Sequence, residues 1–353
     1  MTQRWVNRPD GSNWGEFGED DQRGAMNLVG PDQLQKGVNE IQGLKTFNLS
    51  LPLDLPGGTA LHPSRHPPRR FATLRGGKNA GEQCFCFAMS RENPNFTDVF
   101  SDDVVLLHTQ YSTQWDGLAH VGQEFDADGD GVEEIVFYNG FRADTDVVRA
   151  ERSSPDGEAA WDTWETPRAN ALGIEQLADH GVQGRAVMID LFSHYGEENH
   201  AVTYDELMEI LKKDNVDVER GDMVCFHTGL DDLILQMAGN PDREKLLSSC
   251  AGLDGGDERL LQWITDTGIA ALISDNMAVE LMPKSLRSEG RHAMLPLHNH
   301  CLFKNGIHLG ELWRLGELSR WLRANKRSRF LLTAPPLNLP GAAGSPVSPI
   351  ATV

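Results

Sequence analysis

The feature that most constrains this sequence is an apolar run that ends abruptly in a cluster of polar side chains. Residues 103–107 (Asp-Val-Val-Leu-Leu) are typical of a β-strand and lead directly into residues 107–120, which contain Gln110, Gln114, Asp116 and His120. Secondary structure meets solvent where a strand ends, so polar groups there can be oriented without being buried unpaired. We therefore expect the chemistry of this chain within residues 107–120.

Three further apolar runs, at residues 184–191, 221–229 and 269–276, are also typical of buried strands. Each leads into polar groups or a glycine turn, and the second and third carry His227 and Asp275 near their ends. We regard these two side chains as second-rank candidates for the wall of a substrate pocket.

Helix signals occur in three segments. Pro31 opens a helix predicted to run to about residue 41, because proline is favoured in a first turn. Thr203 and Glu206 have the spacing of a capping box at the start of an amphipathic helix. Residues 257–267 place apolar side chains at helical spacing, which predicts a third helix packed on the core.

No internal repeat and no clear boundary divides the chain. We predict a single domain over residues 1–353, in which about residues 1–45 form an N-terminal arm wrapped on the core. This arm contains fixed glycines and tryptophans, and Trp14 is a candidate for lining a substrate pocket. Trp115 is a second candidate contact, although alternation along a strand turns it away from Asp116 and toward the core.

Composition excludes several classes of partner. The formal net charge is −20, so nucleic-acid phosphates and anionic membrane surfaces would be repelled. Five cysteines without the CxxC spacing of zinc or redox sites indicate reduced thiols and a cytoplasmic protein. The N-terminus begins no apolar signal-peptide core, and no apolar run is long enough to span a membrane. A small-molecule substrate is the expected partner.

Residues 126–131 (Asp-Ala-Asp-Gly-Asp-Gly) imitate the start of an EF-hand calcium loop. That loop requires a glutamate at its twelfth position, where this chain has Phe137. We interpret the segment as an acidic surface turn, with weak calcium binding as the alternative.

The stretch from Gln110 to His120 resembles the signature of the cyclase family, metal-dependent hydrolases that include bacterial kynurenine formamidase and isatin hydrolase. That signature reads His-x-Gly-Thr-His-x-Asp-x-Pro-x-His, and Thr113, Asp116 and His120 match it, whereas Gln110 and Gln114 replace two histidines. The variant Ser-Thr-Gln-Trp-Asp-Gly is similar to a longer branch of the family. The resemblance implies an α/β swivelling β/β/α fold, with a mixed sheet and surrounding helices, and a homodimer or higher homo-oligomer.

The resemblance also implies a site for one divalent metal ion. It assigns metal ligation to a set from both ends of the chain: Asp116, His298, Glu311, Gln114 and Gln110. Amide oxygens are harder and weaker donors than imidazole, so zinc should bind less tightly than at an ordinary family site, and manganese or magnesium comparatively better. We expect manganese or zinc as the ion, with magnesium as a further possibility. The alternative is that both glutamines point their NH₂ groups at a substrate carbonyl and no metal binds.

Each candidate also has a purely structural interpretation. Asp116 would cap the turn that follows it, and His120 would be an ordinary hydrogen-bonded histidine. Only one member of the histidine-rich patch formed by His298, His300 and His308 need be functional.

These residues predict a metal-dependent hydrolase of a small amide, imide, formamide or lactone, similar to an arylformamidase. An activated water would attack the carbonyl, and His120 would act as the acid/base that passes the proton to the leaving group. Two alternatives stay open. One is a cyclase or dehydratase of secondary metabolism, and the other is a metal-free binding protein whose active site has lapsed.

Overall fold

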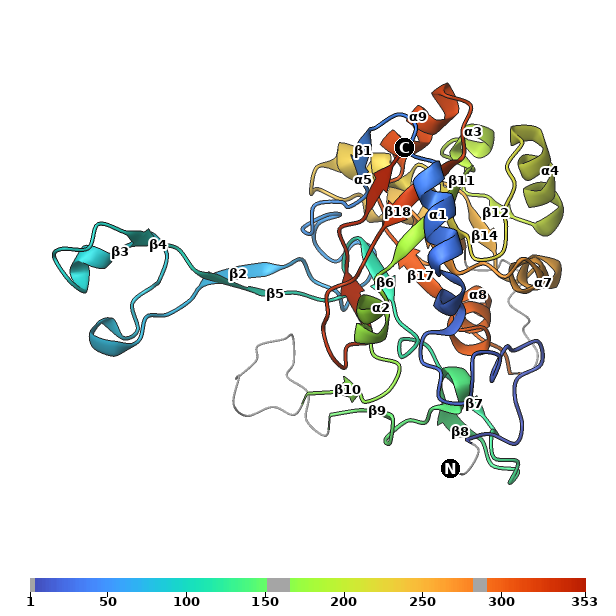
Figure 1. Cartoon of the computed structure of the whole chain (residues 1–353), viewed down its shortest axis with the longest axis horizontal. Coiled ribbons are helices and arrows are strands. Elements are labelled where there is room, and N and C mark those ends of the chain that lie inside the picture. The colour runs from blue at the N-terminus through green and yellow to red at the C-terminus, as the bar shows by residue number, and fades with distance from the viewer. Residues whose placement is uncertain (1–3, 151–165, 282–290) are drawn as a thin grey trace.

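A nine-stranded mixed sheet forms the centre of the computed structural model, which describes residues 4–150, 166–281 and 291–353 (Figure 1). Four neighbouring strands of the sheet run parallel, and the strands on either side of them are antiparallel. The order across the sheet is β1 (Thr46–Asn48), β20 (Ile350–Thr352), β18 (Arg329–Thr333), β11 (Gln183–Asp190), β13 (Met223–His227), β15 (Ala271–Ser274), β17 (His308–Glu311), β6 (Gln114–Asp116) and β19 (Gly344–Pro346).

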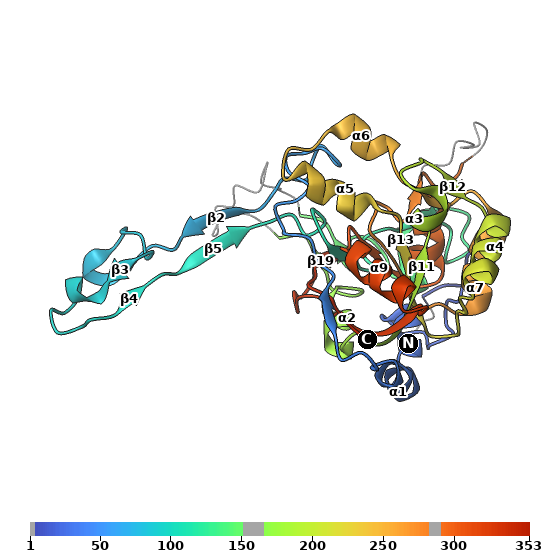
Figure 2. The ribbon, with the colours of Figure 1, turned by 90° about the horizontal axis from the view of Figure 1, so that it is seen from above.

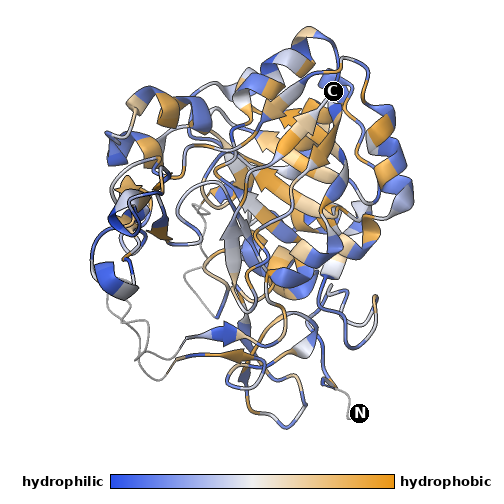
Figure 3. Cartoon of the chain, turned by 60° about the vertical axis from the view of Figure 1, so that its left-hand side comes forward, coloured by the Kyte–Doolittle hydropathy of each residue, from blue (hydrophilic) through white to orange (hydrophobic). Residues whose placement is uncertain are grey.

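Helices cover both faces of this sheet, and its strands are the apolar centre of the molecule (Figure 3). One face packs against α4 and α7, whose Leu207 and Leu260 are fully buried, and the other packs against α2 and α9. The helices are α1 (Pro31–Asn39), α2 (Glu175–His180), α3 (Phe192–Tyr195), α4 (Tyr204–Asp214), α5 (Leu230–Met237), α6 (Arg243–Ser248), α7 (Glu258–Thr267), α8 (Pro296–His298) and α9 (Gly316–Ala324). The predicted α/β architecture with a mixed sheet and surrounding helices is confirmed.

Short two- and three-stranded ribbons and single helical turns complete the fold. The strands are β2 (Arg69–Ala72), β3 (Phe87–Ala88), β4 (Val99–Phe100), β5 (Asp103–Leu106), β7 (Gln123–Phe125), β8 (Glu134–Val136), β9 (Val147–Val148), β10 (Arg168–Ala169), β12 (Ala201–Val202), β14 (Gly252–Asp254) and β16 (Glu280–Leu281). The turns are η1 (Gly24–Leu28), η2 (Gly77–Asn79), η3 (Met89–Arg91), η4 (Tyr138–Gly140) and the π-helical η6 (Asn299–Lys304).

The predicted helix signals are confirmed. Helix α1 begins at Pro31, and α4 begins with the capping box in which Thr203 and Glu206 satisfy each other's backbone groups. Helix α7 has Asp257 as its N-cap, because that carboxylate accepts hydrogen bonds from two backbone N–H groups of the first turn.

The described part of the N-terminal segment packs against the core. Gly24 lies so close to Gly306 that a Cβ at residue 24 would stand 2.1 Å from the carbonyl oxygen of Gly306. Trp14 is 1% exposed, packs edge-on against Phe303 and donates its indole N–H to the Phe303 carbonyl. Trp14 therefore belongs to core packing, and the structure gives no support to the predicted contact with substrate.

Residues 69–106 project from the body as a long two-stranded ribbon, here called the hairpin arm (Figures 1 and 2). The strand predicted at residues 103–107 is present as β5. It pairs with β2 along the arm, whereas β6 joins the central sheet. An apolar pattern indicates a strand but not its partner.

Among the described residues, none of the helices combines the length and the apolar character needed to cross a membrane.

Two buried histidines predict sensitivity to acid. Burial lowers the pKa of His300 to about 4 and that of His308 to about 3. The unfolded chain takes up these protons near pH 6.5, so stability is lost as pH falls from about 6.5 toward the folded-state values. Each histidine is expected to cost roughly 1.4 kcal/mol per pH unit in that window.

Urea unfolding at pH 7 and pH 4.5 tests this expectation. The variant His300→Gln should lose less stability on acidification than the wild type, because glutamine keeps an acceptor for the hydroxyl of Thr265 and cannot titrate. An equal loss in both proteins would show that His300 has no part in the acid response.

Candidate metal centre

The centre is built on the antiparallel pair β17 and β6. Glu311 lies directly opposite Gln114 in this ladder, and Leu309 lies opposite Asp116. Because side chains alternate along a strand, Gln114, Asp116 and Glu311 share one face of the sheet. Trp115 points to the other face, where its indole packs edge-on against Trp313 and donates to a backbone carbonyl.

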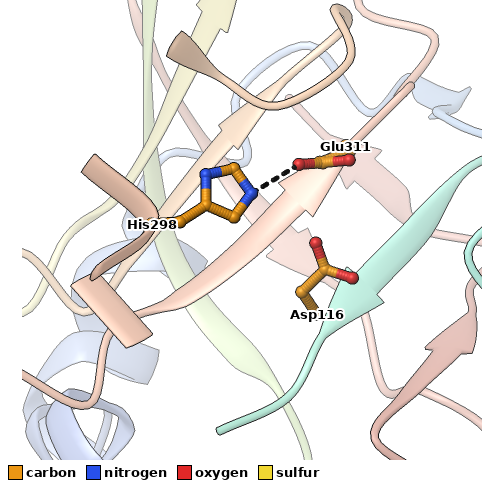
Figure 4. A group of neighbouring side chains, drawn as sticks. All are labelled: Asp116, His298 and Glu311. Carbon is orange, nitrogen blue, oxygen red and sulfur yellow. Dashed lines mark hydrogen bonds and ion pairs between the residues drawn. The ribbon is translucent and has the colours of Figure 1, made fainter. Parts of the chain in front are cut away.

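His298 approaches this pair from α8, so that three side chains converge from separate elements (Figure 4). The possible ligand atoms of Asp116, His298 and Glu311 all lie within 4.8 Å of one another, and all three residues are buried. Gln114 links the two carboxylates, because its NH₂ donates to Asp116 Oδ1 at 3.2 Å and to Glu311 Oε2 at 3.1 Å. The predicted cluster from the two ends of the chain is therefore assembled.

Glu280, which the sequence analysis missed, orients His298. Its carboxylate is 2.9 Å from His298 Nδ1 and also accepts the backbone N–H groups of Leu297 and His298. The other ring nitrogen, Nε2, then faces Glu311 Oε1 at 3.2 Å. A carboxylate behind a histidine in this way fixes the ring and raises its basicity, as it does behind metal-binding histidines.

Electrostatics of the centre show an excess of negative charge. Burial raises the pKa of Asp116, and neighbouring Glu311 raises it further. Burial also lowers the pKa of His298, but its hydrogen bonds with Glu280 and Glu311 outweigh that effect and raise it to about 10. Burial would raise the pKa of Glu311, yet the hydrogen bond from His298 holds it below its usual value. Three buried carboxylates thus share one imidazolium.

A divalent cation fits this set of donors. Asp116 Oδ2 and Gln114 Oε1 are both buried without a hydrogen-bond partner, although they lie among groups that are otherwise well paired. Unsatisfied buried acceptors are costly, and a cation would provide a partner for both of these oxygens. One imidazole with oxygen donors suits manganese or zinc, and magnesium less well.

Two predicted residues lie at the edge of the centre. His120 is partly exposed, with Nε2 at 3.8 Å from Asp116 Oδ1, so it stands where solvent and the buried carboxylates meet. Gln110 makes no hydrogen bond with Asp116, His298 or Glu311, since its Oε1 accepts from Thr109. Metal ligation by Gln110 is therefore not supported by its position in the structure.

A small pocket of about 10 Å³ lies near the centre, and Arg65 and Gln110 are part of its wall. Arg65 donates to the Gln110 carbonyl at 3.0 Å, and its guanidinium is close enough to favour the charged forms of Asp116 and Glu311. The pocket wall also includes His62, Tyr111, Met277 and Leu312. Arg65 was not identified from the sequence, because an isolated arginine among prolines carries no motif.

Family comparisons agree with this geometry. The sequence matches the family model described as "Putative cyclase" over residues 47–281, well over half of the chain. The chain belongs to the cyclase family. His298 and Glu311 lie beyond the matched range, so for this cyclase-family chain their convergence with Asp116 rests on the structure.

Solved structures extend the likeness to nearly the whole chain. A structure titled as a novel cyclase is 29% identical, with a TM-score of 0.71 over 97% of both chains. Isatin hydrolase A from Ralstonia solanacearum is 14% identical, with a TM-score of 0.52 over 87% of this chain and 91% of that one. The enzyme of the same name from Labrenzia aggregata is 13% identical, with a TM-score of 0.53 over 91% and 98%. A search of the curated proteins found no match. The predicted swivelling fold is confirmed.

His227 and Asp275 do not join the centre of this cyclase-family chain. They lie with Asp231 in a second buried group, whose possible ligand atoms are also within 4.8 Å of one another. Burial raises the pKa of Asp231 to about 8, with a further contribution from Asp275. Burial lowers the pKa of His227, but a hydrogen bond with Asp190 dominates and raises it to about 8. Their predicted place in a substrate pocket has no support here.

Residues 126–131 form an acidic turn between strands β7 and β8, as predicted, rather than a loop between helices. Asp126, Asp128 and Glu134 lie together at the surface, and Arg142 pairs with Glu134 at 2.6 Å and approaches Asp128 at 3.7 Å. This arginine already neutralises part of the cluster, and calcium binding stays an untested alternative.

Replacing Glu280 by Gln is expected to weaken metal binding about 10- to 100-fold, because the charge that raises the basicity of His298 is lost. Titration with Mn²⁺ or Zn²⁺, followed by calorimetry and elemental analysis, measures the change. The exposed Glu317→Gln is the matched control and should bind as the wild type does. Unchanged affinity in Glu280→Gln would remove Glu280 from the support of the site.

Proposed function

We propose that this protein is a metal-dependent hydrolase of a small amide, imide, formamide or lactone. The observation that carries the proposal is the buried group of Asp116, His298 and Glu311, with unpaired oxygens on Asp116 and Gln114. Membership of the cyclase family supports it, as does a fold shared with isatin hydrolases. The ligands are Asp116, Glu311, His298 and Gln114, with manganese or zinc as the cation.

Such a cation would lower the pKa of a coordinated water and polarise the substrate carbonyl. The protein supplies the remaining chemistry. Asp116 and Glu311 hold fixed negative charge in a site from which water is largely excluded, where electrostatic interactions are strong. Glu280 keeps His298 in one orientation, so the ligand set is formed before substrate arrives.

His120 is the proposed acid/base for proton transfer. Its ring lies beside Asp116 and is partly open to solvent, which suits a group that must take a proton from the attacking water and deliver it to the leaving nitrogen or oxygen. Hydrolysis of an amide, imide or lactone leaves a carboxylate. Arg65, in the wall of the adjoining pocket, is placed to receive that negative charge.

Activity and metal content together test the proposal. Purified protein loaded with Mn²⁺ or Zn²⁺ is assayed on N-formylkynurenine, isatin and simple lactones, with identification of the products. His120→Asn is expected to lower kcat by about 10²- to 10⁴-fold without loss of metal. Asp116→Ala is expected to lose both metal and activity.

Other outcomes point elsewhere. Metal that persists undiminished in Asp116→Ala would remove Asp116 from the ligand set. Protein that binds no metal would favour a binding protein with a lapsed site. A dehydrated or cyclised product without hydrolysis would favour a cyclase or dehydratase of secondary metabolism.

We also propose that the protein is a homodimer or higher homo-oligomer in which the hairpin arm packs on a second copy of the chain. Seven of the twenty exposed large apolar side chains among the described residues lie in the arm: Phe71, Leu74, Phe85, Phe96, Val99, Phe100 and Val105. A two-stranded ribbon alone is marginally stable in water, so we expect the exposed apolar side chains of the hairpin arm to pack against another protein surface.

Charge supports a second copy as that partner. The arm has five Lys/Arg and five Asp/Glu residues and is neutral, so the rest of the chain carries the whole net charge of −20. A neutral apolar arm can approach an acidic body without the repulsion that two bodies would experience.

Light scattering after size-exclusion chromatography tests the arm. The wild type is expected to be at least dimeric, and the double variant Leu74→Ser, Phe100→Ser is expected to shift toward monomer. Val132→Ser, Ile135→Ser, a matched pair of exposed apolar residues on the body, should leave the mass unchanged. A monomeric wild type, or an oligomer indifferent to the arm variant, would contradict the proposal.

A further inference from the structure

A second row of polar side chains lies where three parallel strands end. Asp190 closes β11, His227 closes β13, and Asp275 follows β15. Asp190 and His227 are directly opposite in the ladder, and the preceding pair of β13 and β15 is Phe226 with Ser274. The row is therefore continuous across neighbouring strands. Carboxyl ends of parallel strands are the edge at which α/β sheets bind ligands.

This row is on the opposite face of the sheet from the metal centre. Phe226 and Leu309 belong to one hydrophobic cluster, so His227, which follows Phe226, points away from that cluster. Glu311 is two residues after Leu309 on the same strand, so its side chain points to the same face of the sheet, toward that cluster. The two groups are thus separated by the thickness of the sheet and do not share ligands.

The hydrogen bonds of His227 leave one ring nitrogen free. Nδ1 lies 2.8 Å from Asp190 Oδ1, and a carboxylate at that distance places the proton on Nδ1. In the neutral form of the ring Nε2 carries a lone pair, and this nitrogen is buried without a hydrogen-bond partner. His227 is only 2% exposed, so water does not satisfy this nitrogen from outside.

The nearest polar atom ahead of Nε2 is another acceptor without a partner. Asp231 Oδ1 is 3.9 Å from His227 Nε2, while Asp231 Oδ2 accepts the backbone N–H of Gly316 at 2.8 Å. Asp231 is fully buried at the start of α5. When both groups are deprotonated, Nε2 and Oδ1 are two unpaired acceptors that face each other in the interior, and a cation between them would satisfy both.

Asp275 completes a third side of the group. Its Oδ1 accepts the backbone N–H of Thr228 and its Oδ2 that of Gly229, both at 2.7 Å. Oδ2 also accepts the backbone N–H of Asp231 at 3.5 Å, so the second lone pair of Oδ1 stays available. The Thr228 hydroxyl is a further buried atom without a partner. The nearby basic side chains are already engaged, because Arg323 pairs with Asp190 and Arg320 with Asp232.

We infer that His227, Asp231 and Asp275 form a second, structural binding site for a divalent transition cation such as Zn²⁺ or Mn²⁺. Imidazole nitrogen with two carboxylate oxygens is a donor set that such cations accept, and separations of the order of 3.9 Å between donors suit one central ion. Asp190 acts as the positioning residue, since it holds the ring from behind as Glu280 holds His298.

The cation would add a further link between elements that already share hydrogen bonds. His227 comes from β13, Asp231 from α5, and Asp275 from the loop after β15. Through Asp231 and the N–H of Gly316, the site also reaches the first residue of α9. Phe192, which is 38% exposed, lies over His227 with ring centroids 5.6 Å apart and closes the site toward solvent. The expected role is stabilisation of the body rather than catalysis.

Metal analysis in a protein without the first site tests the inference. The variant Asp116→Asn, Glu311→Gln is incubated with Mn²⁺ or Zn²⁺, dialysed, and measured for metal content and melting temperature. About one equivalent per chain is expected, with a higher Tm in its presence. Adding Asp231→Asn should abolish both effects, whereas Asp232→Asn, its neighbour on the same helix, should preserve them.

Anomalous scattering from wild-type crystals soaked in Mn²⁺ provides the second measurement, which does not depend on how the variants fold. A peak between His227 Nε2 and Asp231 Oδ1 is expected in addition to one at Asp116 and Glu311. A peak at the first centre alone would overturn the inference, and so would a metal content that Asp231→Asn leaves unchanged. Either result would indicate that His227 and Asp231 share a proton instead. Metal binding is measured separately at the two sites. The absence of metal at the second site would therefore not contradict the proposed hydrolase function of the first.

Discussion

The register between β17 and β6 is the constraint on which the centre depends. It sets Glu311 opposite Gln114 and leaves Asp116 on the same face, so two carboxylates are buried side by side. Burying unpaired charge costs several kcal/mol per group, and the structure must hold the strands in place against that cost. Thr113 does so at the start of β6, where its hydroxyl donates to Leu312 and accepts from Leu51.

Packing on the far side of the sheet keeps the same register. Trp115 and Trp313 are fully buried and pack edge to face with ring centroids 5.0 Å apart. The Trp313 indole donates to the Gln114 carbonyl, which links the packing of one face to the position of a ligand on the other. A one-residue slip of β6 would exchange these faces and bury an indole where Asp116 stands, so the register is strongly specified.

Part of the centre could be predicted from the sequence, because the match of Thr113, Asp116 and His120 to a family signature assigned Asp116, His298 and Glu311 to one metal site. In the folded chain, Gln114 and Asp116 share a face because side chains alternate along a strand. Glu280 escaped prediction because its partner His298 is 18 residues away and the contact exists only in the folded chain. Asp275 and His227 were correctly expected at strand ends. The face of the sheet to which each side chain points depends on the register of its strand in the folded sheet, and the sequence alone does not give that register.

The sheet is also closed by the last segment of the chain. β19 covers the free edge of β6, and β20 lies between β1 and β18, with its final strand residue at Thr352. During synthesis on the ribosome, the strand that carries Asp116 therefore emerges long before its outer neighbour exists. Pairings between such distant segments form slowly. Until residues 344–346 have been synthesised, the outer edge of β6 accordingly has no strand to pair with.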